Sequence, residues 1–287
     1  MAGSAAAKRV SADYHMHLER GPWTLEWLGR FVETARARGL TEIGFSEHPH
    51  RFREWRTLYP ANLPAWVDKA NTQRLDSYLR LIEEARGAGF PVRCGIEWDF
   101  FPGSEAQLER AIRAHPWDYA IGSVHWLPPE EPGGPWWDFD NLSRAGAWAG
   151  RDVLDAYRRY FRILTQAAQS RLFDFIGHAD VIKVCGYRPA EDISDLYESA
   201  ASAFASSGVC VEINTAGWRK PVGEIYPAPR FLQACRRAGV PVLINSDAHI
   251  PEDVGRDFDR AAAYAGGMGY TEVATFASRT RRMVPLA

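Results

Sequence analysis

Short apolar runs alternate with longer amphipathic stretches along nearly the whole chain. Between the runs, apolar side chains recur at helical spacing, as from Leu25 through Leu28 to Phe31. Several of these stretches end in a glycine, which is typical of a helix C-cap. The apolar runs themselves predict seven β-strands, at Val10–Tyr14, Glu42–Phe45, Val92–Ile96, Tyr119–Val124, Phe173–Ile176, Val209–Ile213 and Pro241–Ile244. The pattern predicts an α/β protein.

The number and length of these units indicate a single domain. Seven β/α units over about 270 residues match one parallel barrel better than two stacked domains. An eighth strand at Val273–Phe276 is disfavoured because no polar residue follows it. We therefore predict a distorted (β/α)7 TIM-like barrel over residues 10–287, after a flexible N-terminal segment at 1–9. The long Pro-, Gly- and Trp-rich segment 128–150 is expected to be a functional loop beside the site.

Composition narrows the possible partners. Of the 287 residues, 46% are hydrophobic and 24% charged, which is typical of a globular protein. No segment resembles a signal peptide or a membrane span, so we expect a cytoplasmic protein with no membrane partner. The formal net charge is −2 and the basic residues are dispersed, which disfavours a nucleic-acid partner. A small anionic substrate needs only one or two local cations. The oligomeric state is not predicted.

Histidines and carboxylates gather at the ends of the predicted strands. In a parallel barrel these ends share one rim, so residues far apart in the sequence would meet there. Taken singly, each has a simpler explanation, such as a structural histidine or a solvated acid. Six of the eight histidines nevertheless lie at strand ends, and only His50 and His115 do not. The conjunction predicts a polynuclear metal site. Its candidate residues are His15, His17, His48, Glu97, His125, His178, Asp247 and His249.

Seven motifs in order resemble the polymerase and histidinol phosphatase (PHP) family, and more narrowly its histidinol-phosphatase branch. The motifs are DYHMH, GFSEH, CGIEWDF, IGSVHW, FDFIGHAD, VEINTAGWRKPVGEIYP and INSDAH. The resemblance covers about residues 10 to 250, and seven ordered motifs are far more specific than any one of them. It implies the same distorted barrel with two or three divalent metals.

The resemblance also implies how the ligands divide among the metals. The family commonly places one more ligand about eight residues after the first histidine of the HxH pair. That position here is Trp23, which cannot ligate, and Glu19 is the nearest replacement. Imidazole and carboxylate ligands suit zinc, manganese or iron without choosing among them. The implied groups are His15, His17, Glu97 and Asp247 for the first metal, Glu97, His125 and His178 for the second, and His48 and His249 for the third.

The implied chemistry is hydrolysis of a phosphate ester by a hydroxide that bridges two metals. Asp247 is expected to orient this nucleophile or take its proton, and His249 or a metal-bound water to protonate the leaving alkoxide. Arg219 resembles the family's phosphate-binding arginine. Glu212 and Asn214 are expected to hold ligands in place. Additional candidates are Arg51, Lys183 and Arg188, for which a surface position is equally plausible.

The leading hypothesis is therefore a histidinol-phosphatase of histidine biosynthesis that converts L-histidinol phosphate to L-histidinol and phosphate. Asp138 and Asp140 are candidates for pairing with the ammonium group of that substrate. The first alternative is another small phosphomonoester or phosphodiester, because the metal chemistry is indifferent to the leaving group. A nuclease is disfavoured by the absence of a basic stripe. A metal-binding protein without turnover is the alternative outside the enzymes.

Overall fold

The computed structural model describes residues 12–286. The predicted flexible segment 1–9, and the first two residues of the predicted strand Val10–Tyr14, lie outside this range. Within it, no helix combines the length and the apolar character that a membrane crossing requires.

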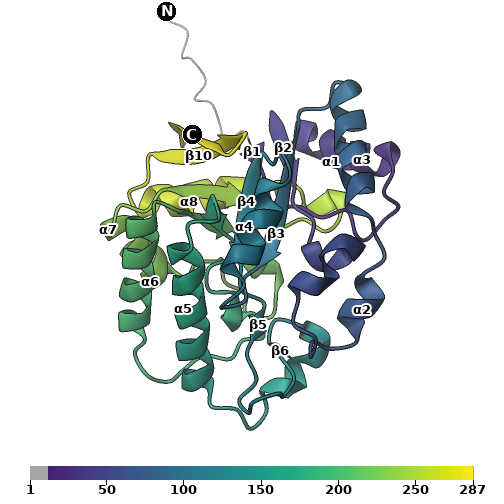
Figure 1. Ribbon diagram of the computed structural model, residues 1–287. Coiled ribbons are helices and arrows are strands. Elements are labelled where there is room, and N and C mark those ends of the chain that lie inside the picture. Colours follow the sequence, from purple (N-terminus) through teal and green to yellow (C-terminus); the bar gives the residue numbers. More distant parts are fainter. Residues whose placement is uncertain (1–11, 287) are drawn as a thin grey trace, which may run out of the picture.

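Seven parallel strands form one sheet, in chain order from β1 to β9, that curls into a nearly closed barrel (Figure 1). The strands are β1 (Ala12–Asp13), β2 (Glu42–Phe45), β3 (Val92–Asp99), β4 (Tyr119–Ser123), β7 (Phe175–Ile176), β8 (Cys210–Asn214) and β9 (Val242–Asn245). Just beyond β1 and β9, Met16 and Ala248 form a parallel bridge. The backbone N–H of Ala248 donates to the carbonyl of His15 at 3.1 Å, and that of His17 donates to the carbonyl of Ala248 at 2.8 Å. The predicted distorted seven-stranded barrel is confirmed.

Helices between the strands cover the outside of the barrel. In α1, for example, Thr24 accepts a hydrogen bond from the backbone of Trp27, and Leu28, Phe31 and Val32 are buried. The helices are α1 (Leu25–Ala37), α2 (Trp66–Ala70), α3 (Leu75–Gly87), α4 (Glu105–Arg113), α5 (Val153–Gln169), α6 (Ser194–Ser207), α7 (Pro229–Arg237) and α8 (Phe258–Gly267). Short 3₁₀ turns lie in several of the loops after strands, among them η3 (Leu142–Trp148) and η5 (Thr215–Arg219). Gly208 ends α6 in the left-handed conformation, at φ 75°, as predicted for a C-cap.

A C-terminal hairpin closes the amino-terminal end of the barrel. Its strands, β10 (Glu272–Ala277) and β11 (Thr280–Pro285), are antiparallel and form a sheet of their own, so Val273–Phe276 is not an eighth barrel strand. The ring of Phe276 lies 5.7 Å from that of Phe175 and 6.4 Å from that of Tyr14. With Tyr119, these rings fill the barrel interior beneath the hairpin. This end is therefore a packed apolar plug.

The opposite end of the barrel carries the long loop predicted at 128–150. The strands β5 (Trp126–Leu127) and β6 (Trp137–Asp138) pair antiparallel at its base, at the far end of the molecule from β10 (Figure 1). Trp137, Phe139 and Trp148 of this segment are buried. The tryptophans that prompted the prediction thus anchor the loop above the carboxyl ends of the strands.

Candidate metal centre

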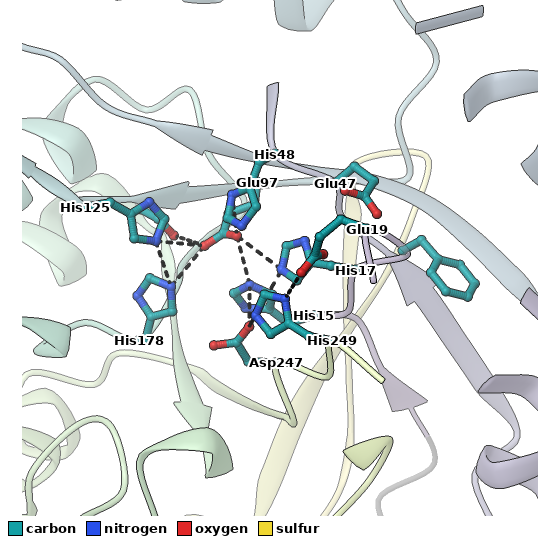
Figure 2. A network of polar contacts seen from close by, with 12 residues as sticks. His15, His17, Glu19, Glu47, His48, Glu97, His125, His178, Asp247 and His249 are labelled. Atoms are coloured by element: carbon teal, nitrogen blue, oxygen red, sulfur yellow. Dashed lines mark hydrogen bonds and ion pairs between the residues drawn. The ribbon is translucent and has the colours of Figure 1, made fainter. Parts of the chain in front are cut away.

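The predicted ligands meet at the carboxyl ends of the parallel strands. Figure 2 shows imidazoles from the segments after β1, β2, β4 and β7 turned toward Glu97, which lies in the last part of β3. Asp247 and His249, after β9, lie beside the two histidines that follow β1. All are buried or nearly so, with side-chain exposures from 0% to 22%. The group that the structure brings together is His15, His17, His48, Glu97, His125, His178, Asp247 and His249.

Glu97 is the centre of this group. Its Oε2 lies 3.1 Å from Nε2 of His15, 3.4 Å from Nε2 of His17 and 3.2 Å from Nδ1 of His48. Its Oε1 faces the other side, 3.0 Å from Nε2 of His178 and 3.5 Å from Nε2 of His125. The two oxygens of one carboxylate therefore face two different sets of imidazoles. This is the arrangement expected of a carboxylate that bridges two ions.

Asp247 completes the set on the side of the first two histidines. Its Oδ1 lies 3.7 Å from Nε2 of His15, 3.6 Å from Nε2 of His17 and 3.2 Å from Nε2 of His249. The backbone of Asp247 is left-handed, with φ at 52°, and that of His178 has φ at 25°. Residues other than glycine rarely adopt positive φ, and such backbone strain gathers at functional sites. Both side chains are thus aimed at the centre at a conformational cost.

Unpartnered polar atoms test whether this group fits a metal. Within residues 12–286, no hydrogen bond of acceptable geometry reaches Nε2 of His15, either ring nitrogen of His17, Nδ1 of His48 or Oε2 of Glu97, although all are buried. Burying such atoms without partners is costly. The potential ligand atoms form three overlapping groups, and within each group these atoms lie within 4.8 Å of one another. The groups are His15, His17 and Asp247; His15, Glu97 and His178; and His17, His48 and Glu97. The residues fit divalent cations.

A fourth group of potential ligand atoms includes Glu19, the predicted replacement for the ligand that Trp23 cannot supply. It consists of His17, Glu19 and Glu47. Trp23 packs instead against Phe52, with ring centroids 5.8 Å apart. Oε1 of Glu19 lies 2.6 Å from Nδ1 of His249, which places the predicted replacement at the site.

Glu47 was missed as a candidate by sequence reasoning, although it stands next to His48 at a strand end. It is fully buried, and burial followed by the nearby charge of Glu19 raises its pKa to about 8. Its Oε2 has no hydrogen-bond partner among the described residues. An acid at the end of a parallel strand was the signal that could have identified it.

A buried acid behind the ligands, Glu212, fixes the positions of His15 and His178. Oε1 of Glu212 lies 2.7 Å from Nδ1 of His15, and its Oε2 accepts the backbone N–H of His178 at 2.7 Å. Asn214 and Asn245 donate to the same carboxylate. Because Nδ1 of His15 is occupied in this way, Nε2 is left facing Glu97. The predicted supporting role of Glu212 agrees with these contacts.

Charges in the cluster depend on one another. Burial favours the protonated form of Glu97, but His15 and His48 outweigh it and hold the pKa of this carboxyl well below its ordinary value. Burial likewise opposes protonation of His125, yet Asp99, 2.6 Å from its Nδ1, raises the pKa of the imidazole to about 10. The carboxyl group of Glu97 is therefore ionised and available as a ligand near neutral pH.

A comparison with protein families bears on this geometry. The model of the PHP domain family matches residues 13–216, which include all but the last two of the converging ligands. The chain belongs to the PHP family.

Relatives of this PHP chain carry histidinol-phosphatase names. A protein of Deinococcus radiodurans called probable histidinol-phosphatase is 33% identical over 279 residues, covering 95% of this chain and 98% of the relative. The histidinol-phosphatase of Bacillus subtilis is 25% identical and covers 86% and 96%. A crystal structure of histidinol phosphate phosphatase from Lactococcus lactis, complexed with zinc, L-histidinol and phosphate, shares the fold at a TM-score of 0.71 and 20% identity, covering 95% of this chain and 99% of that one.

The cavity of the PHP site opens above the cluster and is lined by residues of several loops. Glu97, His125, His178, Asp247 and His249 form its floor. The walls include His48, His50, Trp66, Asp99, Trp126, Asp140, Leu142, Val181, Val184, Lys220 and Tyr226. The long loop after β5 thus contributes Asp140 and Leu142, in agreement with its predicted place beside the site.

The predicted phosphate-binding arginine does not line this cavity. The guanidinium of Arg219 donates to the carbonyl of Ser246 at 2.8 Å and pairs with Asp253 at 3.6 Å. The next residue, Lys220, does line the cavity, and no hydrogen bond or ion pair of its ammonium group occurs within residues 12–286. Adjacent residues of a tight turn point in different directions, which sequence alone does not resolve.

The three additional cations lie outside the cavity lining. Arg188 pairs with Glu224 at 3.0 Å. Lys183 is buried, with its ammonium 2.9 Å from Asp180, 2.7 Å from Glu224 and 2.8 Å from the carbonyl of Ile225. These contacts leave it no free hydrogen for a ligand. Nε of Arg51 lies 3.9 Å from Oε2 of Glu47, beside the fourth group of potential ligands.

Proposed function

We propose that this PHP-family protein is a metal-dependent phosphatase that hydrolyses L-histidinol phosphate to L-histidinol and phosphate. The observation that supports it most is the convergence of six imidazoles, Glu97 and Asp247 beneath an open cavity. A closed structural site would fill its coordination with protein atoms, whereas here one side faces the cavity. The names of the relatives supply the substrate.

The residues divide into sets that would each hold one divalent ion. His15, His17 and Asp247 hold the first, and His125 and His178 the second, with Glu97 shared between them. Glu19, Glu47, His48 and His249 surround the place of a third. Ions held there would supply a nucleophilic water at neutral pH and neutralise charge on the phosphate oxygens. Zinc, manganese and iron all suit this ligand set.

The side chains of the chain itself bind and orient the ester. Lys220 places a free ammonium in the cavity wall, where it pairs with a phosphate oxygen. Tyr226 lines the same wall, and its hydroxyl has no partner within residues 12–286, so it is available to donate a second hydrogen bond. Arg219 lies behind Lys220 and holds the turn through Ser246. Its predicted direct contact with phosphate stays a prediction.

Proton transfer is assigned to the residues at the end of β9. Asp247 borders both the cluster and the cavity, so its carboxylate can accept the proton of the attacking water. Glu19 occupies Nδ1 of His249, which leaves Nε2 facing Asp247 and the cavity. The two predicted roles of His249, as a ligand and as the donor to the leaving alkoxide, both need this Nε2 and exclude each other, because a nitrogen that ligates an ion carries no proton. With His249 as a ligand, the alkoxide would take its proton from the other predicted donor, a metal-bound water.

One experiment tests the site and the substrate together. The purified protein is analysed for metal, and phosphate release is measured from histidinol phosphate, sugar phosphates and nucleotides, before and after chelation. We expect bound divalent metal, activity that chelation removes and added metal restores, and the highest kcat/KM for histidinol phosphate. If kcat/KM for histidinol phosphate is far below that for simple sugar or nucleotide phosphates, histidinol phosphate is rejected as the substrate. An Asp247→Asn variant with full turnover and full metal content would reject the proton assignment.

A further inference from the structure

Four carboxylates line the cavity, and three of them are already engaged. Glu97 and Asp247 face the histidines of the metal centre. Asp99 accepts from the hydroxyl of Tyr59 at 2.7 Å and lies 2.6 Å from Nδ1 of His125, so it is committed to positioning that imidazole. The fourth is Asp140. Within residues 12–286, its side chain makes no hydrogen bond and no ion pair.

The backbone on either side of Asp140 is held firmly. Asp138 is buried and accepts from Arg144 at 2.8 Å and from Nε1 of Trp66 at 3.0 Å. Phe139 is buried, and its carbonyl accepts the indole N–H of Trp148 at 3.1 Å. On the other side, Asn141 caps the turn η3. Asp140 is thus a free acid on a fixed loop, which is how a selective binding group is built.

Asp138, the other acid named from the sequence, has a different role. Arg144 reaches both of its oxygens, at 2.8 and 3.0 Å, and Asn141 donates to it as well. Its capacity to accept hydrogen bonds is taken up inside the loop. A cationic ligand in the cavity therefore meets Asp140 and not Asp138.

The free charges in the wall are of opposite sign. Among the described residues that line the cavity, Lys220 is a cation and Asp140 an acid that make no hydrogen bond and no ion pair, and Asp140 lies within electrostatic reach of the imidazoles of His125 and His178. Leaving a charge half-buried and unpaired costs free energy that a ligand of opposite charge recovers. Such a cavity favours a ligand with an anionic and a cationic group. The stacked rings of Trp66 and Trp126, 5.6 Å apart, and Val184 offer flat and apolar surface for the remainder.

We propose that Asp140 binds the ammonium group of the substrate and makes the enzyme selective for 2-aminoalkyl phosphates over esters without an amine. The proposal rests on the proposed function, in which the ester phosphate lies over the metal centre beside Lys220. Asp140 contacts neither phosphate nor the attacked phosphorus. It is a specificity residue, and it acts on the part of the substrate that the metals do not touch.

The test compares esters that differ only in the amine. The first pair is L-histidinol phosphate and 3-(imidazol-4-yl)propyl phosphate, and the second is 2-aminoethyl phosphate and ethyl phosphate. The metal-loaded enzyme and its Asp140→Asn variant are assayed on all four. We expect the variant to lose about 10- to 100-fold in kcat/KM on the amines and far less on their partners, so that selectivity in each pair falls toward one. Glu131→Gln, an exposed acid of the same loop, is the matched control.

The outcomes separate the two proposals. If selectivity for the amine disappears in the second pair while histidinol phosphate is a poor substrate, Asp140 is confirmed and the proposed substrate is wrong. Equal losses on all four esters, or a fall in metal content of the variant, would assign Asp140 to the metal centre and overturn the inference. A wild-type enzyme that shows no preference for the amine in either pair overturns it as well.

Discussion

The two ends of the barrel are built from the same strands and are opposite in character. At the amino-terminal end the acids have fixed basic partners, as in the pairs Glu42–Arg93, Asp118–Arg86 and Asp174–Arg279. Aromatic rings fill the interior, and the hairpin of β10 and β11 covers them. At the carboxyl-terminal end, buried imidazole and carboxylate atoms of the metal centre have no hydrogen-bond partner within residues 12–286.

This difference shows where the fold gains stability and where it loses it. Apolar burial at the closed end contributes roughly 25 cal/mol per Å² removed from water. At the open end, unpaired polar atoms cost free energy, which a bound ligand recovers. Substitutions at the two ends should therefore separate activity from stability.

The largest effect is expected at the centre of the open end. Glu97→Gln removes the charge that faces both sets of imidazoles, so metal content should fall and kcat/KM should drop on the order of 10³-fold or more. The free energy of unfolding of the metal-free protein should fall as well, because the buried imidazoles that hold the pKa of Glu97 below its ordinary value lose their counter-charge. Elemental analysis, phosphate release and urea unfolding check this. Retained activity with retained metal would contradict the central role of Glu97.

The matching substitution at the closed end should affect stability alone. Phe276 is 3% exposed. Phe276→Ala opens a cavity in the plug and should lower the free energy of unfolding by about 3–5 kcal/mol. The folded fraction should keep kcat/KM within about twofold, since no ligand touches this ring. A loss of activity per folded molecule comparable to that of Glu97→Gln would show that the two ends are coupled.

A smaller effect distinguishes two neighbouring cations at the open end. Lys220→Met should raise KM for phosphate esters and lower kcat/KM about tenfold or somewhat more, because one charge-assisted contact is lost. Arg219→Lys should change kcat/KM less, since Arg219 is tied to Ser246 and Asp253. Steady-state kinetics on one ester decides the order. The opposite ranking would assign the phosphate to Arg219, as the sequence predicted.

The smallest effect concerns pH at the closed end. Burial raises the pKa of Asp174 to about 6, against the opposing charge of Arg279, from an ordinary value of 3.8. The folded protein then binds the proton more tightly, so the contribution of this acid is most favourable below about pH 4 and is lost as pH rises through 6. Relative to Asp174→Asn, the wild type should lose on the order of 1 kcal/mol of stability between pH 4.5 and 7.5. Urea unfolding at both pH values measures it, and a difference independent of pH would disprove the shift.

Prediction from sequence succeeded where periodicity and strand polarity determine position. His15 and His17 stand two apart after a strand, and Glu97 lies near the end of β3, so a parallel barrel carries all three to one rim. These positions followed from the hydrophobic pattern alone, without any information on side-chain contacts. The same reasoning excluded β10 from the barrel.

Prediction was weaker wherever the backbone turns. Lys220 and Arg219 are neighbours in a turn, and only the three-dimensional path decides which one faces the cavity. Lys183 follows a strand end, where a residue that contacts the substrate was expected, yet its side chain pairs with Asp180 in the interior. Glu47 was not predicted as a metal ligand because the neighbouring His48 was assigned that role. Contacts between segments far apart in the sequence determine which of these side chains faces the cavity, and the local sequence pattern does not reveal such contacts.

The bridge between Met16 and Ala248 has a consequence for biosynthesis. It joins the segment that bears the first two ligands to the segment that bears the last two, more than 200 residues later. During translation, a chain that has emerged only as far as β8 has its early histidines exposed without Asp247 or His249. On the proposed function, complete metal loading therefore requires that Asp247 and His249 have left the ribosome and that the two segments have paired across this long sequence separation.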